Sequence, residues 1–336
     1  MEWISSAILT RIETPLSMSR PNGLVTTSDT RSNRLGSISF DLDNLSEYKG
    51  FYGYSWSERS VCRIWELGLE RIIEFLNLLD IKATFFVITD YLRFPIVRRT
   101  LEFLVSQGHE LASHTHTHPY PFSHESRAAK WREVEHSKKL LEDAFGVPVI
   151  GFRAPGYDID SKTLDMLEEC GYLYDSSIMP TVLNPLIVLA SRLKSKWHTR
   201  SPFHWSHILA PLEPYYPKHG SVVFPQSTPR NIKEIPISVL PYIRYPFYPT
   251  FLNATGMIGL RLKYKLAKKL KFFVFEMHTI DFISHQDTYD IKELRNHPGI
   301  YYPYKIKIGF YEWIVKEMAT TFDMKPIASI LVSLDD

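Results

Sequence analysis

The stretch GSISFDLD, residues 36–43, is the part of this 336-residue chain that decides its fold. Residues 37–40 are typical of a buried β-strand, and Asp41 and Asp43 come at its end. A carboxylate beside a buried strand is costly unless it meets a cation, hydrogen-bond donors or water. We therefore expect a polar site where this strand ends, with a simple pair of capping residues in a turn as the alternative.

Strands and helices alternate along the rest of the chain. Spacing of apolar residues predicts helices at 58–79, 95–105, 125–145, 161–170, 255–270 and 304–322. Short apolar runs predict further strands at 83–88, 109–113, 149–152, 172–177, 232–239, 272–277 and 327–334. Seven or eight such units imply a parallel sheet closed into an α/β barrel, in which side chains at the carboxyl ends of the strands meet.

Composition limits the classes of function and the domain organisation. A net charge of +2 argues against nucleic acid as the main partner, and 44% hydrophobic residues allow a large core. Residues 1–34 are polar and lack an apolar signal segment, so we expect a flexible tail before one domain at 35–336. Residues 180–230 break the alternation and predict an irregular insertion. No stretch is long and apolar enough to span a bilayer.

Polar residues follow three more of the predicted strands. His114 ends the strand at 109–113 and lies with His118 in the tight turn that follows. Arg153 follows 149–152, and His278 follows 272–277. Neutral imidazole is a preferred ligand of zinc and similar ions, and one carboxylate of the Asp pair can complete such a site. The other carboxylate can accept a proton from water, and Arg153 can hold it.

Each motif alone has a simpler interpretation. The two histidines could lie in a surface turn, Arg153 could be a surface residue, and His278 could be a core histidine with its hydrogen bonds satisfied. His116 lies between His114 and His118 and is expected to point away from them. The order and spacing of all the motifs together favour a metal-dependent hydrolase with His278 as proton donor.

These motifs resemble those of the polysaccharide deacetylase (NodB-homology) superfamily, carbohydrate esterase family 4. The matching segments are Phe40-Asp41 with a second acid, His114-Thr115-x-x-His118, Arg153-x-Pro155, the strand ATFFV at 83–87 and the apolar run that ends at His278. The resemblance covers about residues 37–281. It implies an irregular (β/α)7 barrel. The chain departs from the commonest pattern because Leu42 separates its two acids.

The resemblance implies a role for each site residue. Asp43, His114 and His118 would bind one divalent ion, zinc or alternatively cobalt or nickel. Asp41 would be the general base, Arg153 would orient Asp41, and His278 would be the general acid. A backbone N–H just after Pro155, that of Gly156, would help to stabilise the oxyanion. Asp175 and Asp281 are both candidates to support His278.

We therefore expect a carbohydrate N-deacetylase that removes an N-acyl group, acetyl, from an amino sugar of a glycan or a lipid-linked glycan intermediate. A deformylase of a lipid-linked amino sugar and a catalytically silent carbohydrate-binding barrel are the alternatives. The expected location is the cytoplasm. Lysines of the predicted helix at 255–270 suggest contact with a membrane face, with an ordinary solvated helix as the alternative. The sequence leaves the sugar, the acyl group and the oligomeric state open.

Overall fold

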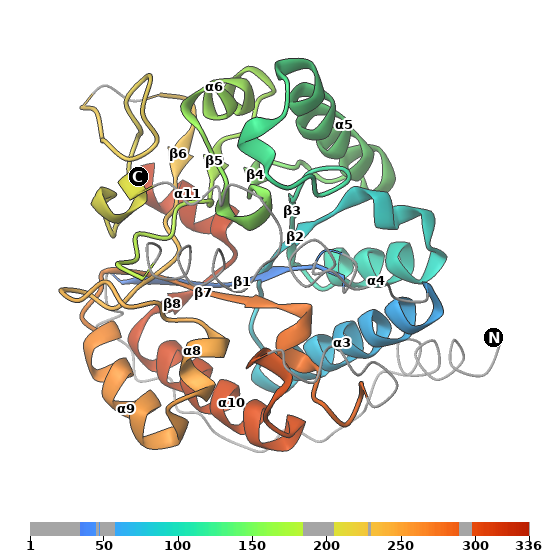
Figure 1. The fold of residues 1–336 in the computed structure, drawn as a ribbon, viewed down its shortest axis with the longest axis vertical. Helices are drawn as coiled ribbons and strands as arrows, with labels where there is room; N and C mark the ends of the chain where they lie inside the picture. The colour runs from blue at the N-terminus through green and yellow to red at the C-terminus, as the bar shows by residue number, and fades with distance from the viewer. Residues whose placement is uncertain are drawn as a thin grey trace, which may run out of the picture.

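A computed structural model describes residues 34–44, 47, 58–183, 205–227, 230–288 and 298–335. A parallel sheet with the strand order β6-β5-β4-β3-β2-β1-β7 forms its centre, and β8 pairs with the start of β1 (Figure 1). The strands are β1 (Leu35–Asp41), β2 (Thr84–Val87), β3 (Glu110–Ser113), β4 (Gly151–Phe152), β5 (Tyr174–Asp175), β6 (Lys233–Glu234), β7 (Phe272–His278) and β8 (Asp323–Met324).

The first strand organises the sheet. All seven residues of β1 pair with β7, from Leu35 opposite Phe272 to Asp41 opposite His278, and its second half also pairs with β2. The far edge comes back to β7 through Ser238, whose N–H donates to the Val274 carbonyl at 3.2 Å. The sheet therefore curls into an irregular barrel, as predicted, and the carboxyl ends of its strands converge.

Helices surround the sheet (Figure 1). The Ser126 hydroxyl and the Asp160 carboxylate cap the starts of α5 and α6, and α5 ends at Gly146 with φ of 65°. The α-helices are α3 (Glu58–Leu79), α4 (Pro95–Ser106), α5 (Arg127–Phe145), α6 (Ser161–Glu169), α8 (Pro249–Asn253), α9 (Gly256–Ala267), α10 (Tyr304–Thr321) and α11 (Ile327–Asp335). In the described part of the chain, none of them is both long and apolar enough to span a bilayer.

The last predicted strand, 327–334, is wrong, because this segment is the helix α11. Ile327, Ile330 and Leu331 are buried, which is the spacing of one helix face, whereas alternation would have turned Ser329 inward. These side chains pack with Phe86, Ala112, Tyr174, Ile235, Phe272 and Val274 inside the barrel. Helix α11 therefore fills the apolar part of the barrel interior, and we call it the plug of the barrel.

The start of α11 explains a second feature of the barrel interior. Its first N–H groups donate to the Thr84 hydroxyl (2.9 Å) and to the Glu110 carboxylate (2.9 Å). Glu110 also accepts from the Tyr174 hydroxyl at 2.7 Å. A carboxylate is favourable at a helix N-terminus, so Glu110 ties α11 to the amino-terminal end of the sheet.

Of the other predicted elements, some have the predicted bounds, some are shorter than predicted, and some lie outside the described residues. Helix α3 has the predicted bounds, but the predicted strand 232–239 is regular only at Lys233–Glu234. Residues 1–33 and 184–204 are not described, so the tail and the domain limits at 34/35 stay predictions. The described part of the 180–230 segment contains the short 3-10 helix η5 (Trp205–Leu209). In this segment Tyr215 forms an antiparallel bridge with Glu234 of β6. Its Arg230 bonds Asp165 and Glu168 of α6.

The plug role of α11 gives a stability prediction. Ile330→Ala should lower the free energy of unfolding by about 2–5 kcal/mol, because it leaves a cavity inside the barrel. Val332→Ala on the same helix is the control, since Val332 is 65% exposed and its truncation should cost little. Urea unfolding of both variants measures this, and equal costs would contradict the packing described.

Candidate active site

The strand period explains why Leu42 stands between the two acids. Leu42 is fully buried in the core outside the sheet, so Asp41 and Asp43 both point to the opposite side, toward the end of the barrel. The Leu42 N–H donates to the Phe86 carbonyl, and its carbonyl accepts from the Trp65 indole. The first bond continues the pairing of β1 with β2 as far as the acids, and the second joins this segment to helix α3.

A tight turn after β3 positions the two histidines. Thr115 and His118 have left-handed φ values of 67° and 55°, which non-glycine residues adopt rarely and at an energetic cost. The Thr115 hydroxyl accepts the His118 N–H, and Glu133 of α5 accepts the N–H groups of the two residues between them. The turn is therefore held by specific bonds that bring both rings to the same side.

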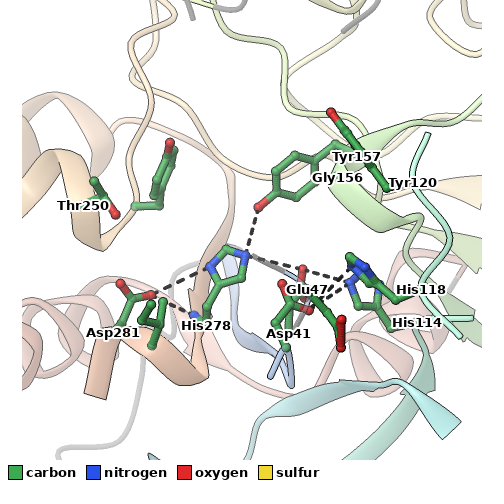
Figure 2. A pocket seen from close by; sticks show the side chains of 13 residues that line it. Asp41, Glu47, His114, His118, Tyr120, Gly156, Tyr157, Thr250, His278 and Asp281 are labelled. Carbon is green, nitrogen blue, oxygen red and sulfur yellow. Dashed lines mark hydrogen bonds and ion pairs between the residues drawn. The ribbon is translucent and has the colours of Figure 1, made fainter. Parts of the chain in front are cut away.

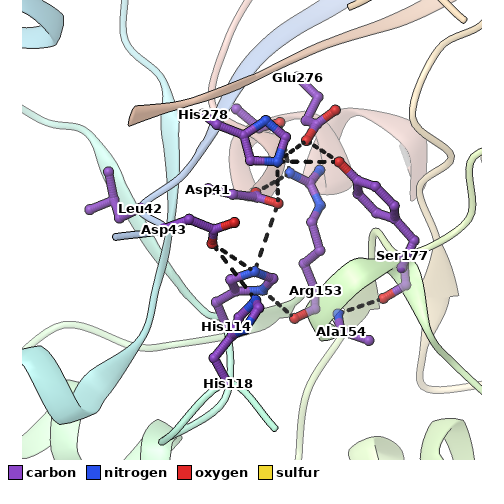
Figure 3. A network of polar contacts seen from close by, with 12 residues as sticks. Asp41, Leu42, Asp43, His114, His118, Arg153, Ala154, Ser177, Glu276 and His278 are labelled. Atoms are coloured by element: carbon purple, nitrogen blue, oxygen red, sulfur yellow. Dashed lines mark hydrogen bonds and ion pairs between the residues drawn. The ribbon is translucent and has the colours of Figure 1, made fainter. Parts of the chain in front are cut away.

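Asp43, His114 and His118 converge (Figure 3). Asp43 Oδ1 lies 3.3 Å from His114 Nε2 and 3.8 Å from His118 Nε2. Burial raises the pKa of Asp43, but the adjacent histidines outweigh it and hold that pKa below its ordinary value. Burial lowers the pKa of His118 to about 4, so this ring is neutral at pH 7. For His114 the neighbouring carboxylates outweigh burial and raise the pKa.

The donor set of these three residues fits a divalent metal ion. Asp43 Oδ1 and His118 Nε2 are buried, and neither has a well-aligned hydrogen-bond partner in the part of the chain that is described. The His114 Nδ1–H donates to the Arg153 carbonyl at 2.7 Å, which directs the lone pair of Nε2 toward Asp43 in the neutral ring. One carboxylate and two imidazoles suit zinc and leave coordination positions open.

Arg153 and Asp41 form a fully buried ion pair beside this cluster. Arg153 Nη1 lies 2.5 Å from Asp41 Oδ1 and also donates to Ser39. The other nitrogens donate to the backbone and the hydroxyl of Ser176, and the guanidinium stacks on Phe86 at 3.9 Å. With so many bonds, the pair is fixed in position, and the second oxygen of Asp41 faces His114 and His278 at 3.9 Å from each.

His278 completes the arrangement at the end of β7, where it pairs directly with Asp41 of the neighbouring strand β1. Asp281 accepts its N–H at 2.8 Å and lies 3.8 Å from its Nδ1. Its Nε2 lies 3.1 Å from Glu276 and 3.4 Å from the Tyr157 hydroxyl. Burial alone would lower the pKa of His278, but Glu276 first and then Asp281 and Asp41 raise it well above its ordinary value.

One cleft, shown in Figure 2, is lined by the clustered side chains Asp41, Asp43, His114, His118, His278 and Asp281. Tyr120, Tyr157 and Tyr248 supply aromatic walls. Gly156 also lines the cleft with φ of 59°, and a side chain there would collide with the Tyr120 ring. The Tyr157 N–H already donates to the Ala154 carbonyl, whereas no hydrogen bond of the Gly156 N–H is found among the described residues. The Gly156 N–H is therefore the better candidate for an oxyanion donor.

All six predicted site residues lie together, and of the two candidate acids only Asp281 is found in contact with His278 among the described residues. Asp281 contacts His278, whereas Asp175 accepts from the Ser177 hydroxyl and pairs with Glu234. His116 points away, as predicted, and bonds Thr89. Asp41, Glu276 and His278 could also surround an ion, but Arg153 already supplies the cation at Asp41.

The sequence analysis missed Glu276 and the side chain of Tyr157. A signal for Glu276 was available, since it is a lone acid inside the apolar run FFVFEM at 272–277. It lies two residues before His278, so on a strand both side chains point to the same face. No comparable signal marked Tyr157, because its contact depends on the conformation of the loop after Arg153.

Comparisons with known proteins agree with this geometry. A family model described as polysaccharide deacetylase matches residues 64–174, a range that contains His114, His118 and Arg153. A peptidoglycan deacetylase of Helicobacter pylori is 25% identical over 165 residues, which are 47% of this chain and 53% of that protein. Chitin deacetylase 1 of Bombyx mori is 29% identical over 40% of this chain and 27% of its own length. The chain thus matches about half of the first relative and about a quarter of the second.

Solved structures share the fold. A structure from Mycobacterium smegmatis, assigned to the polysaccharide deacetylases, has a TM-score of 0.56 at 17% identity and matches 91% of this chain and 92% of its own. Puue allantoinase has a TM-score of 0.53 at 12% identity, with 94% and 97% matched. At such identities the likeness establishes the irregular barrel fold alone.

The buried ion pair gives a stability prediction. Arg153→Met should destabilise the protein by about 3–5 kcal/mol, because it leaves the Asp41 carboxylate buried without its cation. The double variant with Asp41→Asn should recover part of this loss, since the amide carries no charge. Arg127→Met is the control, because its pair with Glu169 is exposed and should contribute at most about 1 kcal/mol. Denaturant unfolding with a double-mutant cycle decides, and a purely additive cycle would contradict the coupling.

The metal-ligand cluster gives a prediction about metal content. Purified protein supplied with Zn²⁺ should hold about one ion per chain, and His114→Ala/His118→Ala should hold none. His116→Ala is the matched control from the same turn and should keep the ion. Elemental analysis after dialysis measures this. Zinc affinity should fall as the pH drops, because protons compete for His114. Equal metal content in all three proteins would refute this ligand set.

Proposed function

We propose that the chain belongs to the polysaccharide deacetylase superfamily and that it is a metal-dependent carbohydrate N-deacetylase, which removes an N-acyl group, specifically acetyl, from an amino sugar. One observation supports this most. A single cleft holds the candidate metal ligands, the Asp41 carboxylate bound by Arg153, and His278. Hydrolysis of an amide needs these three kinds of group: an electrophile, a base and a proton donor for the amine.

Asp43, His114 and His118 would hold the ion. When bound, Zn²⁺, or Co²⁺ or Ni²⁺ in its place, would polarise the substrate carbonyl and lower the pKa of water. Asp41 would accept the proton of the attacking water through its second oxygen, while Arg153 fixes the first. The Gly156 N–H would donate to the developing oxyanion.

His278 would protonate the departing amine. Its position supports this role, because Nε2 lies on the far side of Asp41 from His114, so base and acid face the reacting carbonyl from different directions. The raised pKa keeps the ring protonated at neutral pH, as a general acid requires. Two neighbouring groups, one a base and one an acid, thus divide the proton transfers.

The aromatic walls of the cleft support a sugar substrate. Tyr120, Tyr157 and Tyr248 offer flat faces beside the polar cluster, and sugar rings stack on such faces while their hydroxyl groups need hydrogen-bond partners. The relatives are named for peptidoglycan and chitin, both polymers of N-acetylated amino sugars. A glycan or a glycan intermediate is therefore the proposed substrate class.

Lipid linkage of the substrate and contact with a membrane face stay proposals, as does the cytoplasmic location. Helix α9 supports membrane contact, because Ile258 and Leu262 are 79% and 59% exposed among its lysines. Exposed apolar side chains beside lysines are the composition of a peripheral contact with anionic lipid.

The test is acetate release from N-acetylated glucosamine oligomers by zinc-loaded protein. Asp41→Asn should lower kcat by about 10²–10⁴-fold while the protein keeps its zinc, because the variant loses a general base and not a ligand. His116→Ala should retain activity. Formate release from N-formylated substrates, without acetate release, would favour the deformylase. Sugar binding without any turnover in zinc-loaded protein would refute the hydrolase and leave the silent binding barrel.

A further inference from the structure

Glu276 is a buried acid in contact with the proposed proton donor. It precedes His278 by two residues on β7, so both side chains point to the same face, and it lies opposite Ser39 of β1. Glu276 is fully buried. Figure 3 shows its carboxylate beside the His278 ring, on the side away from the metal-ligand cluster.

A buried carboxylate must be compensated, and the partners of Glu276 are few. The Tyr157 hydroxyl donates to Oε1, which also lies 3.1 Å from His278 Nε2. Oε2 has no hydrogen-bond partner in the described structure. Arg153 is nearby, but its side chain donates to Asp41, Ser39 and Ser176. A positive charge on His278 is therefore the compensation within hydrogen-bond reach.

Charged groups face His278 from every element around it. Asp41 and Asp43 lie at the end of β1, Asp281 lies in η6 (Thr279–Phe282) next to Nδ1, and Glu276 lies next to Nε2. Burial raises the pKa of Glu276, while the positive charge of His278 opposes this. The carboxylates around the ring favour a proton on His278.

The backbone at Tyr157 is held in a costly conformation that brings its phenol to this pair. Tyr157 has a left-handed φ of 61° and directly follows Gly156, also left-handed. Its hydroxyl donates to Glu276 Oε1 and lies 3.4 Å from His278 Nε2. Strained residues persist where the surrounding structure fixes them, commonly at functional sites.

We propose that Glu276 and Tyr157 are positioning residues for His278. Glu276 accepts the Nε2–H of a cationic ring, and Tyr157 fixes the carboxylate, so that His278 enters the reaction with the proton already in place. This inference rests on the proposed function, in which His278 is the proton donor. Glu276 would act through His278, since it is not among the residues that line the cleft.

The proton transfer balances as follows. When the carbon–nitrogen bond breaks, its electron pair goes to the nitrogen, which takes the Nε2 proton, and His278 becomes neutral. Water supplies the oxygen of the released carboxylate, and no oxidant or reductant is needed.

The direct test is the titration of His278 in zinc-loaded protein, followed by nitrogen-15 NMR and assigned by the signal lost in His278→Gln. Glu276→Gln keeps the shape but removes the charge, so the titration midpoint should fall by at least about one pH unit, a tenfold change in the dissociation constant. Tyr157→Phe should shift it in the same direction by less. Glu276→Asp should preserve much of the wild-type midpoint.

Glu110→Gln is the matched control. Glu110 is also a buried glutamate that accepts a tyrosine hydroxyl, but it lies at the opposite end of the barrel without a histidine. Its loss should affect stability and leave the His278 midpoint unchanged. In activity assays, the alkaline limb of the pH profile of kcat should move to lower pH in Glu276→Gln and should stay in place in Glu110→Gln.

Two outcomes would overturn the proposal. The first is an unchanged His278 midpoint in Glu276→Gln, and the second is a uniform loss of activity at every pH with the profile unmoved. Failure of the proposed function is distinguishable from both. If wild-type protein hydrolyses no acylated amino sugar, the NMR midpoints still decide whether Glu276 holds the proton on His278.

Discussion

The buried pair between Arg153 and Asp41 is the interaction on which the site depends. A guanidinium and a carboxylate removed from water are costly, and their cost is offset only when further bonds satisfy them. Here Ser39, Ser176 and the face of Phe86 supply those bonds. Because these partners come from different strands, the pair can form only when the barrel is assembled, which couples the fold to the proposed base.

Arg153 also connects the two halves of the site through its main chain. Its side chain holds Asp41, and its carbonyl accepts the Nδ1–H of His114 and so fixes the tautomer of a proposed metal ligand. The next residue, Ala154, donates its N–H to Ser177. One short segment after β4 therefore positions the base and a ligand together, and the turn after it brings Gly156 and Tyr157 to the cleft.

Much of this arrangement was predictable from particular residues. Parallel strands bring their carboxyl ends to the same edge of the sheet, so polar residues after four strands had to meet. Helix α11 was not predictable from its apolar content, because a run such as IASILVSL fits a strand or a helix and the space inside the barrel decided. The position of Glu276 in an apolar run marked it as unusual, but its contacts with His278 and Tyr157 could be seen only in the folded chain.

The sequence by itself determined the strand–helix alternation and the spacing that turns Asp41 and Asp43 to one side and Leu42 to the other, because local periodicity sets which face each side chain occupies. It also predicted six candidate site residues from their types and their order along the chain. Only the tertiary structure shows that Asp281 and not Asp175 contacts His278, that α11 fills the barrel, and that Glu276 lies between the Tyr157 hydroxyl and His278 Nε2. Those contacts join residues far apart in the chain, and only folding sets the distances between them.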